Sequence, residues 1–158
     1  MEDLEQLTIR KAAAQDIDAI YRLLAEYAKD KLLLGRSPED IGYHLDNFVV
    51  AEASGRFAGC CALRYFGGDL YEVRSLAVCK ELAGKWIGSR IIRFLVDQMR
   101  QRQQPCRIFA LTYHPRLFVR QGFHPVSKEL FPPKIWFDCS NCPKYDHCDE
   151  EAVMLELE

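Results

Sequence analysis

The stretch Tyr71–Val96, YEVRSLAVCKELAGKWIGSRIIRFLV, carries the patterns of a strand, a turn and a helix in direct succession. Its first third alternates in character with a period of two, which indicates a strand. The two predicted faces of that strand are Val73, Ser75 and Ala77 on one side, and Glu72, Arg74 and Leu76 on the other. Beyond the turn, apolar residues recur at helical spacing from Ile87 to Leu95. The stretch therefore predicts a strand–turn–helix unit.

The turn inside this unit contains Gly84 and Gly88. The first four N–H groups of a helix have no intrahelical partner, and the helix dipole favours negative charge at that end. We therefore expect the turn to bind an anion, and our working hypothesis is the pyrophosphate of a cofactor. The alternative is an ordinary strand–turn–helix connection without a ligand.

The composition indicates one globular domain spanning 1–158, with 49 % apolar and 28 % charged residues. A net charge of −2 gives no reason to expect nucleic-acid binding. Apolar runs stay below the ~18 residues that a membrane span needs, and the acidic beginning lacks the apolar core of a secretory leader. We therefore expect a cytoplasmic protein without nucleic-acid or membrane partners, with its seven cysteines mostly as thiols.

The segment before this unit predicts a strand at Leu7–Lys11 and an amphipathic helix at Ala14–Lys29. Ser37 followed by Pro38 is a typical helix start, a serine cap with proline in the first helical position, and that short helix should end near Leu45. The remaining predicted elements are strands at Asn47–Ala53, Arg56–Phe66 and Leu70–Val78, a helix at Ile87–Gln101, a strand at Cys106–Leu111, a helix at Pro115–Gln121, and strands at Phe123–Val126 and Ala152–Leu157.

This order, β-α-α-β-β-β-α-β-α-β plus a C-terminal strand, predicts an α+β fold. We expect a mixed, mostly antiparallel central sheet flanked by helices, with a hairpin turn at Ser54-Gly55. The strands on either side of the central helix should be parallel and joined by a right-handed crossover. A Cys-rich loop at about 127–151 precedes the last strand.

Three stretches resemble the GNAT superfamily of N-acetyltransferases: IRKA before the first helix, SLAV before the glycine turn, and FVRQGF at Phe118–Phe123. A narrower resemblance is to the short stand-alone bacterial N-acetylglutamate synthases. It rests on LLLGRSPEDIGYHLDNFVVAE (Leu32–Glu52), YEVRSLAV and KIWFDCSNCPKYDHCDEEAVMLEL (Lys134–Leu157). The resemblance implies a GNAT-like fold and transfer of an acetyl group from acetyl-CoA to the α-amine of glutamate, the start of arginine biosynthesis.

The resemblance also implies which residues hold the cofactor. The backbone of Leu76, Ala77 and Val78 would contact the pantetheine arm, and Phe118 would lie beside the cofactor. The pyrophosphate would lie at Gly84, Lys85, Trp86, Ile87, Gly88 and Ser89. This turn departs from the family pattern Gln/Arg-x-x-Gly-x-Gly/Ala, because Ala83 replaces the first residue and Trp86 the middle glycine. Cofactor binding therefore requires the Trp86 indole to point away from the N–H groups.

The resemblance places a general base at Glu72, because the attacking ammonium must lose a proton. The alternative is a solvent-exposed strand carboxylate. The family often supplies a tyrosine to protonate the leaving thiolate, but the matching residue is Phe118, which has no proton to donate. Tyr113 is the candidate acid and His114 a second one. The alternatives are a merely packed Tyr113 and a thiolate that leaves unassisted.

A glutamate substrate brings two carboxylates, for which arginine is the natural partner. Arg36 matches a recurrent arginine of the group, and Arg74 should share a sheet face with Glu72. Arg64 and Lys134 are weaker candidates. The alternative for each arginine is a solvated surface charge.

The C-terminal cysteines Cys139, Cys142 and Cys148 have the spacing C-x2-C-x5-C. This pattern is compatible with zinc, with a disulfide or redox role, or with plain thiols, and we expect no metal. A homodimer is possible. Two rival functions remain: an acetyltransferase with another amine acceptor, and a non-catalytic ligand-sensing or partner-binding domain, which the departures Ala83, Trp86 and Phe118 favour.

Overall fold

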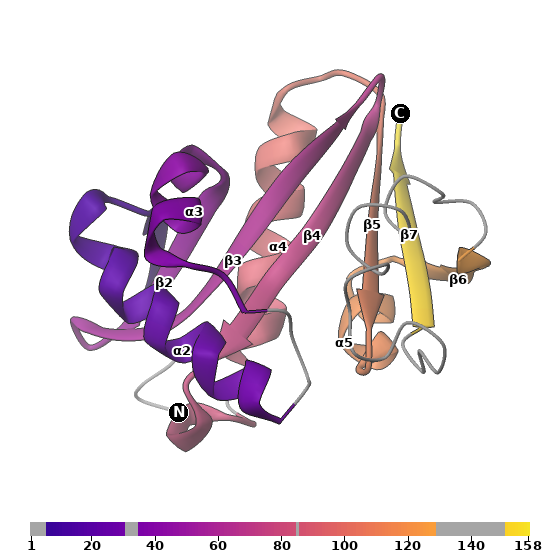
Figure 1. Ribbon diagram of the computed structural model, residues 1–158. Coiled ribbons are helices and arrows are strands. Elements are labelled where there is room, and N and C mark those ends of the chain that lie inside the picture. The colour runs from indigo at the N-terminus through magenta and orange to yellow at the C-terminus, as the bar shows by residue number, and fades with distance from the viewer. Residues whose placement is uncertain (1–5, 31–34, 85, 129–150) are drawn as a thin grey trace.

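The computed structural model describes residues 6–30, 35–84, 86–128 and 151–158. They form a seven-stranded sheet of order β1-β2-β3-β4-β5-β7-β6 (Figure 1). The strands are β1 (Leu7–Lys11), β2 (Phe48–Ala53), β3 (Arg56–Gly67), β4 (Leu70–Val78), β5 (Cys106–Thr112), β6 (His124–Val126) and β7 (Glu151–Leu157). Neighbouring strands are antiparallel except β4 and β5, which are parallel as predicted. The predicted α+β class is confirmed.

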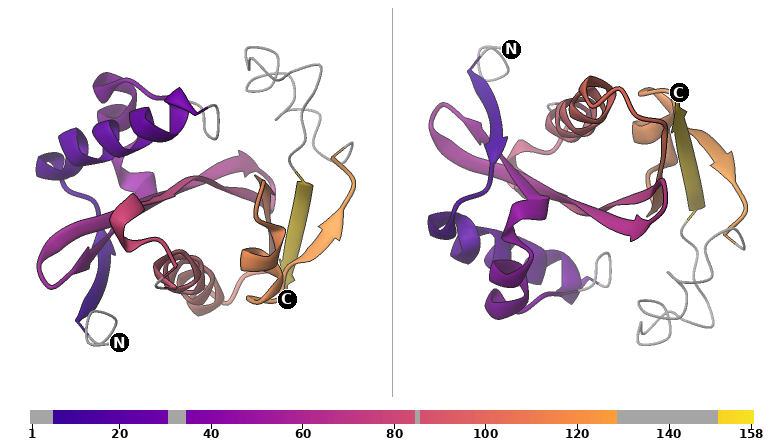
Figure 2. Two further views of the ribbon diagram at one scale, coloured as in Figure 1. Left: turned by 90° about the horizontal axis from the view of Figure 1, so that it is seen from below. Right: turned by 90° about the horizontal axis from the view of Figure 1, so that it is seen from above.

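Helices cover both faces of the sheet. They are α2 (Ile17–Lys29), α3 (Pro38–Tyr43), α4 (Ile87–Gln101) and α5 (Pro115–Val119). Helices α2 and α3 lie on one face and α4 on the other, with α5 beside β7 at the end of β5 (Figure 2). Within the described ranges, every helix is too short or too polar to cross a membrane.

Most predicted element boundaries agree with the structure within two residues. The helix predicted from Ala14 begins with a 3-10 turn at Ala14–Asp16, where Asp16 accepts a hydrogen bond from the Ala13 N–H at 2.7 Å and pairs with Arg10. Short 3-10 turns also occur at Leu45–Asn47 and Lys80–Leu82. The Ser37 cap is confirmed, because its hydroxyl accepts the Asp40 N–H at 3.0 Å.

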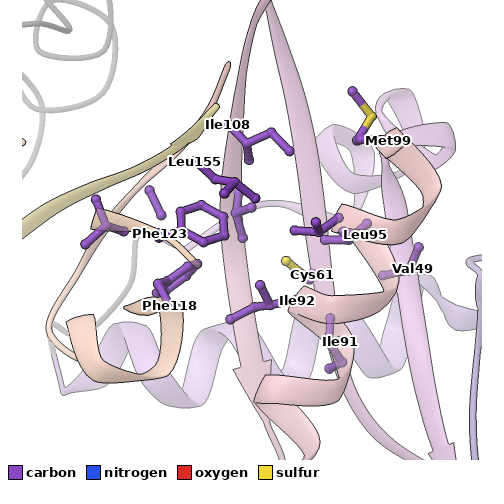
Figure 3. Close-up of a cluster of buried hydrophobic side chains, with 14 of the residues drawn as sticks. Val49, Cys61, Ile91, Ile92, Leu95, Met99, Ile108, Phe118, Phe123 and Leu155 are labelled. Carbon is purple, nitrogen blue, oxygen red and sulfur yellow. The ribbon is translucent and has the colours of Figure 1, made fainter. Parts of the chain in front are cut away.

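The main core lies between the sheet and α4 (Figure 3). Ile91 and Ile92 of α4 are fully buried against strand residues such as Val49 and Cys61. Phe118 and Phe123 extend the cluster toward β7, with their rings at 5.3 Å between centroids in a T-shaped contact. This packing fixes α4, and therefore its N-terminus, relative to β4 and α5.

A β-bulge interrupts β4 and corrects the predicted alternation. The register with β3 shifts between Ala62, which faces Arg74, and Cys60, which faces Ala77. Ser75, inside the bulge, has a left-handed backbone with φ of 55°. Because one residue is extra, Val73 packs in the α4 core whereas Ala77 packs in the α2 core. The predicted single face of Val73, Ser75 and Ala77 is therefore wrong beyond the bulge.

Strands β4 and β5 pair over only three residues and then separate. Leu70–Glu72 face Arg107–Phe109, and the pairing ends at Glu72. In Figure 1 the two strands lie close together at the top of the view and diverge toward α5. The divergence creates a fork in the middle of the sheet, with Glu72 at its apex and α4 and α5 beside its open end.

Candidate active site

An apolar cleft of about 200 Å³ lies in the fork between β4 and β5. Its walls are Val73–Val78 of β4, residues 111–114 at the end of β5, Gly88 of α4, Leu117 and Phe118 of α5, and Tyr27 of α2. The Tyr27 hydroxyl donates a 2.6 Å hydrogen bond to the Val78 carbonyl, which ties α2 to the open end of β4. Burial raises the pKa of Tyr27, so this hydroxyl keeps its proton as a donor. The cleft suits a narrow, partly apolar chain.

The N-terminus of α4 opens onto this cleft. The helix begins at Ile87 without an acidic residue in its first turn, and Gly88 lines the cleft wall. A methyl group on Gly88 would lie 3.3 Å from Leu117, so glycine lets α4 and α5 approach closely here. The Ser89 hydroxyl is buried and lacks a hydrogen-bond partner among the described residues. Free helix N–H groups and an unsatisfied hydroxyl are the donors that a phosphate group requires.

The Trp86 side chain is exposed and contacts Arg120. Trp86 caps α4 in a left-handed conformation, with φ of 66°, at the position where the family pattern has glycine. Its indole is 57 % exposed, and the Arg120 guanidinium lies 4.9 Å from the ring centroid. The substitution therefore leaves the helix N-terminus accessible, and the departure at Trp86 does not exclude cofactor binding.

The cofactor residues predicted from the sequence divide into three groups. Leu76, Ala77, Val78, Gly88 and Phe118 line the cleft. Gly84, with φ of 87°, Trp86, Ile87 and Ser89 form the turn and first helical residues beside it; the Ile87 side chain is itself buried in the core. Lys85 lies outside the described residues. Gly88, predicted in the loop, is the second residue of α4.

A second cavity, of about 330 Å³, lies on the α3 side of the sheet and is lined by three arginines. Arg36 comes from the segment before α3, Arg64 from β3 and Arg74 from β4. The other lining residues are Asp40, His44, Asn47 and Ala62. The sequence had ranked Arg64 below the other two, but register places it opposite Glu72 on the neighbouring strand. The cavity is suited to an anionic ligand.

Arg36 is held firmly at the cavity wall. Its side chain is 9 % exposed, its Nε donates to Asp40 Oδ2 at 2.7 Å, and its guanidinium lies 5.0 Å from the Phe48 ring centroid. This hydrogen bond lowers the pKa of Asp40, so the pair stays ionised at neutral pH. The guanidinium also approaches the Ser75 hydroxyl in the bulge at 3.5 Å. The alternative that Arg36 is a solvated surface charge is wrong.

Glu72 is buried at the apex of the fork, with a residue exposure of 1 %. Its Oε1 atom lies 3.8 Å from Nη1 of Arg74, whose side chain is also largely buried. The alternative of a solvent-exposed strand carboxylate is therefore wrong, and the predicted shared face of Glu72 and Arg74 is confirmed. Arg74 lines both cavities, whereas Glu72 is not a lining residue of either and reaches them only through its neighbour Arg74.

Tyr113 and His114, the candidate acids, both line the apolar cleft at the end of β5. Tyr113 is partly buried, whereas His114 is exposed. Phe118 is buried against Phe123 and presents only a ring to the cleft. Tyr113 is thus better placed than His114 to keep a fixed position beside a ligand.

Sequence reasoning missed several residues of these cavities, among them Tyr27, Asp40 and His44. Tyr27 lies in the helix predicted at Ala14–Lys29 and Asp40 in the short helix that begins after Ser37, but neither was singled out as a site residue. His44, whose Nδ1 lies 3.1 Å from Asp40 Oδ1, was not singled out. The spacing of Arg36, Asp40 and His44 by four residues each gave a usable signal, because such residues lie on one side of a helical turn.

The predicted cysteine cluster Cys139, Cys142 and Cys148 lies outside the described residues, as does Lys134. Among the residues that are described, no group of three metal-binding side chains occurs. Cys60, Cys61, Cys79 and Cys106 are free thiols. Burial raises the pKa of Cys60 to about 12, which makes this thiol a packing residue rather than a nucleophile.

Comparisons with known proteins agree with this geometry. Residues 44–125 match the acetyltransferase (GNAT) domain family. An uncharacterized N-acetyltransferase of Chlorobaculum tepidum is 39 % identical over 94 % of this chain and 96 % of its own length. The amino-acid acetyltransferase of Mycobacterium tuberculosis is 34 % identical over 78 % of this chain and 74 % of its own.

A solved structure with a similar fold is N-acetylglutamate synthase from Neisseria gonorrhoeae, complexed with coenzyme A and N-acetyl-glutamate. Its TM-score is 0.81 at 27 % identity, and the match covers 96 % of this chain. This chain spans 35 % of the length of that protein.

Proposed function

Because the chain belongs to the acetyltransferase (GNAT) domain family and is an N-acetyltransferase, we propose that it transfers the acetyl group of acetyl-CoA to the α-amine of glutamate. In this role it serves the first step of arginine biosynthesis in the cytoplasm. The names of the amino-acid acetyltransferase and N-acetylglutamate synthase relatives support the choice of acceptor.

The adjacency of the two cavities at Arg74 is the observation that carries this proposal. One cavity is apolar and bounded by strand backbone, and the other is lined by three arginines. A thioester in the first and a dicarboxylate in the second approach each other at Arg74, the neighbour of Glu72. Such juxtaposition of two reactants converts a bimolecular step into an effectively unimolecular one.

The cleft residues bind the cofactor chiefly through the backbone. The divergence from β5 leaves one edge of β4 without a neighbouring strand beyond Glu72, while on the other edge Ala77 and Val78 still pair with Cys60 and Gly59 of β3. Backbone groups of Leu76–Val78 are then available to the amides of a pantetheine arm. The free N–H groups at the start of α4 and the Ser89 hydroxyl hold the pyrophosphate. The bound thioester supplies an activated acetyl group.

The arginines select the acceptor. Arg64 and Arg74 bind its carboxylates from the sheet, and Arg36 binds them from the opposite wall of the cavity. Because guanidinium groups match carboxylates in a bidentate geometry, glutamate is favoured over glutamine, which carries one carboxylate fewer. The cation–π contact between Arg36 and the Phe48 ring keeps the guanidinium oriented before the acceptor binds.

Glu72 and Tyr113 move the protons. Glu72 accepts the proton of the α-ammonium, directly or through one water molecule, so that the amine attacks the thioester carbonyl. Tyr113 donates a proton to the leaving thiolate from the opposite wall of the cleft. The Arg74 guanidinium lies 3.8 Å from the Glu72 carboxylate.

The test is CoA release measured with a panel of acceptors: glutamate, glutamine, aspartate, leucine and spermidine. We expect kcat/KM to be highest for glutamate, at least tenfold above glutamine, since one bidentate ion pair is lost. Turnover of spermidine alone would assign another acceptor class. Calorimetry with acetyl-CoA tests the non-catalytic alternative separately. A protein that binds no acetyl-CoA at millimolar concentration is the non-catalytic domain that Ala83 and Phe118 suggested.

A further inference from the structure

The exposed indole of Trp86 forms a stacked pair with Arg120 beside the N-terminus of α4. The guanidinium of Arg120 lies 4.9 Å from the ring centroid, yet the tryptophan remains 57 % exposed. Within the described part of the chain, Arg120 makes no ion pair with a carboxylate, so its charge is available to a ligand.

The pair lies next to residues of the apolar cleft, although neither Trp86 nor Arg120 lines the cleft itself. Trp86 immediately precedes α4, and Gly88, two residues later, forms part of the cleft wall. Leu117 of α5 contacts Gly88, and Arg120 follows Leu117 by three residues. At this spacing Leu117 and Arg120 lie on the same side of α5, the side that faces α4. A ligand that extends from Glu72 past the start of α4 therefore emerges next to the Trp86–Arg120 pair.

The surrounding charge favours an anion at this position. Arg90, one turn after Trp86, and Arg116 of α5 are exposed like Arg120. The first turn of α4 contains no acidic residue. A phosphate monoester carries nearly two negative charges and three acceptor oxygens, and arginine binds it through paired N–H donors.

We propose that Trp86 and Arg120 bind the nucleotide end of coenzyme A, with the indole stacked on the adenine base and Arg120 paired with the 3′-phosphate. This inference rests on the proposed use of acetyl-CoA, and it assigns a role to the residue that departs most from the family pattern. The pair makes the protein select coenzyme A over 3′-dephospho-CoA and over shorter pantetheine thioesters.

The left-handed backbone at Trp86 provides a variant that separates binding from folding. A non-glycine residue with φ of 66° is strained, whereas glycine adopts this conformation without cost. Trp86→Gly therefore should raise the melting temperature while removing the stacking surface. Loss of affinity in a protein of higher stability cannot be attributed to misfolding.

The experiment is calorimetry with coenzyme A, 3′-dephospho-CoA and pantetheine, without an acceptor. We expect the wild-type protein to bind coenzyme A about tenfold more tightly than dephospho-CoA. Arg120→Gln should reduce this ratio to less than twofold, and Trp86→Gly should weaken both nucleotides about tenfold while leaving pantetheine unchanged. Arg102→Gln is the matched control. The Arg102 guanidinium likewise lies over an aromatic ring, that of Tyr71, but at the opposite end of α4.

Fluorescence supplies a direct readout of the stacking. The chain has two tryptophans, so a Trp136→Phe background leaves Trp86 as the only indole. Coenzyme A should quench its emission, and pantetheine should not. Equal affinity for coenzyme A and dephospho-CoA in the wild-type protein, or unchanged coenzyme A affinity in Trp86→Gly, overturns the inference while the proposed function stands. Failure of coenzyme A itself to bind overturns both.

Discussion

The two cavities that meet at Arg74 are built in different ways. The arginine-lined cavity depends on three guanidinium side chains that converge from three separate segments. The apolar cleft depends on the backbone of a bulged strand, a helix N-terminus and apolar side chains. A site made of charges changes its ligand when one side chain changes, whereas a site made of backbone tolerates many side chains as long as the shape is kept. We therefore expect acceptor choice to be sensitive to single substitutions and cofactor binding to be robust.

The two left-handed residues of the region show the same contrast. Ser75 is in the bulge between the cavities and meets the Arg36 guanidinium, whereas Trp86 is exposed next to residues of the apolar cleft. Strained conformations persist where the surroundings determine them strongly, and they gather at functional sites. Ser75 is held by strand pairing on both sides of the bulge, and Trp86 is held by the start of α4.

Glu72→Gln should have the largest effect, because Glu72 is the proposed base and lies 3.8 Å from Arg74, which lines both cavities. The amide has the same shape but does not accept the ammonium proton, so kcat should fall about 100-fold or more. Assays of CoA release between pH 6 and pH 9 measure the fall in kcat and its pH dependence.

The matched control is Glu52→Gln, which also removes a strand carboxylate paired with an arginine, here Arg10 at 3.0 Å, but far from both cavities. It should leave kcat unchanged. A Glu72→Gln protein with the wild-type pH–rate profile removes this residue from the base role.

Arg74→Gln tests the arginine-lined cavity through a residue that also borders the apolar cleft and lies 3.8 Å from Glu72. The loss of one guanidinium should raise the KM for glutamate about tenfold, because a charge-assisted pair is replaced by a neutral contact. The KM for acetyl-CoA should stay within twofold, since Arg74 contributes only one wall of the apolar cleft. Steady-state kinetics with each substrate varied in turn measure both constants.

Arg107→Gln is the control for Arg74→Gln, because Arg107 is a strand arginine paired with Asp69 at 2.9 Å on the surface. Its removal should alter neither KM. An equal rise of both KM values in Arg74→Gln contradicts the division of labour between the cavities.

Gly88→Ala should have the smallest effect. It tests the apolar cleft rather than the arginine-lined cavity. The added methyl group meets Leu117 at 3.3 Å and narrows the cleft, so the KM for acetyl-CoA should rise a few-fold while the KM for glutamate does not change. Gly42→Ala is the control, because its methyl group meets only the Ile17 side chain at an ordinary 3.5 Å. A change in the glutamate KM alone refutes the assignment of Gly88 to the cofactor cleft.

Local patterns were sufficient to predict the elements. Helical spacing located α2 and α4, and the Ser37-Pro38 pair located the start of α3, because these features depend on residues within one or two turns. The family resemblance singled out Arg36 and Arg74 of the arginine-lined cavity, as well as the buried Glu72. What local patterns did not provide was the environment of each one.

The sequence alone determined the order of strands and helices, the family resemblance and the chemical types available at the site. Only the tertiary structure decided the bulge at Ser75, the early separation of β4 from β5, the burial of Glu72 and the outward direction of the Trp86 indole. The physical reason is that periodicity is set by neighbours along the chain. Register, burial and side-chain direction are set by residues such as Cys61, Phe109 and Arg120, which are distant in sequence and meet only when the sheet and α4 pack together.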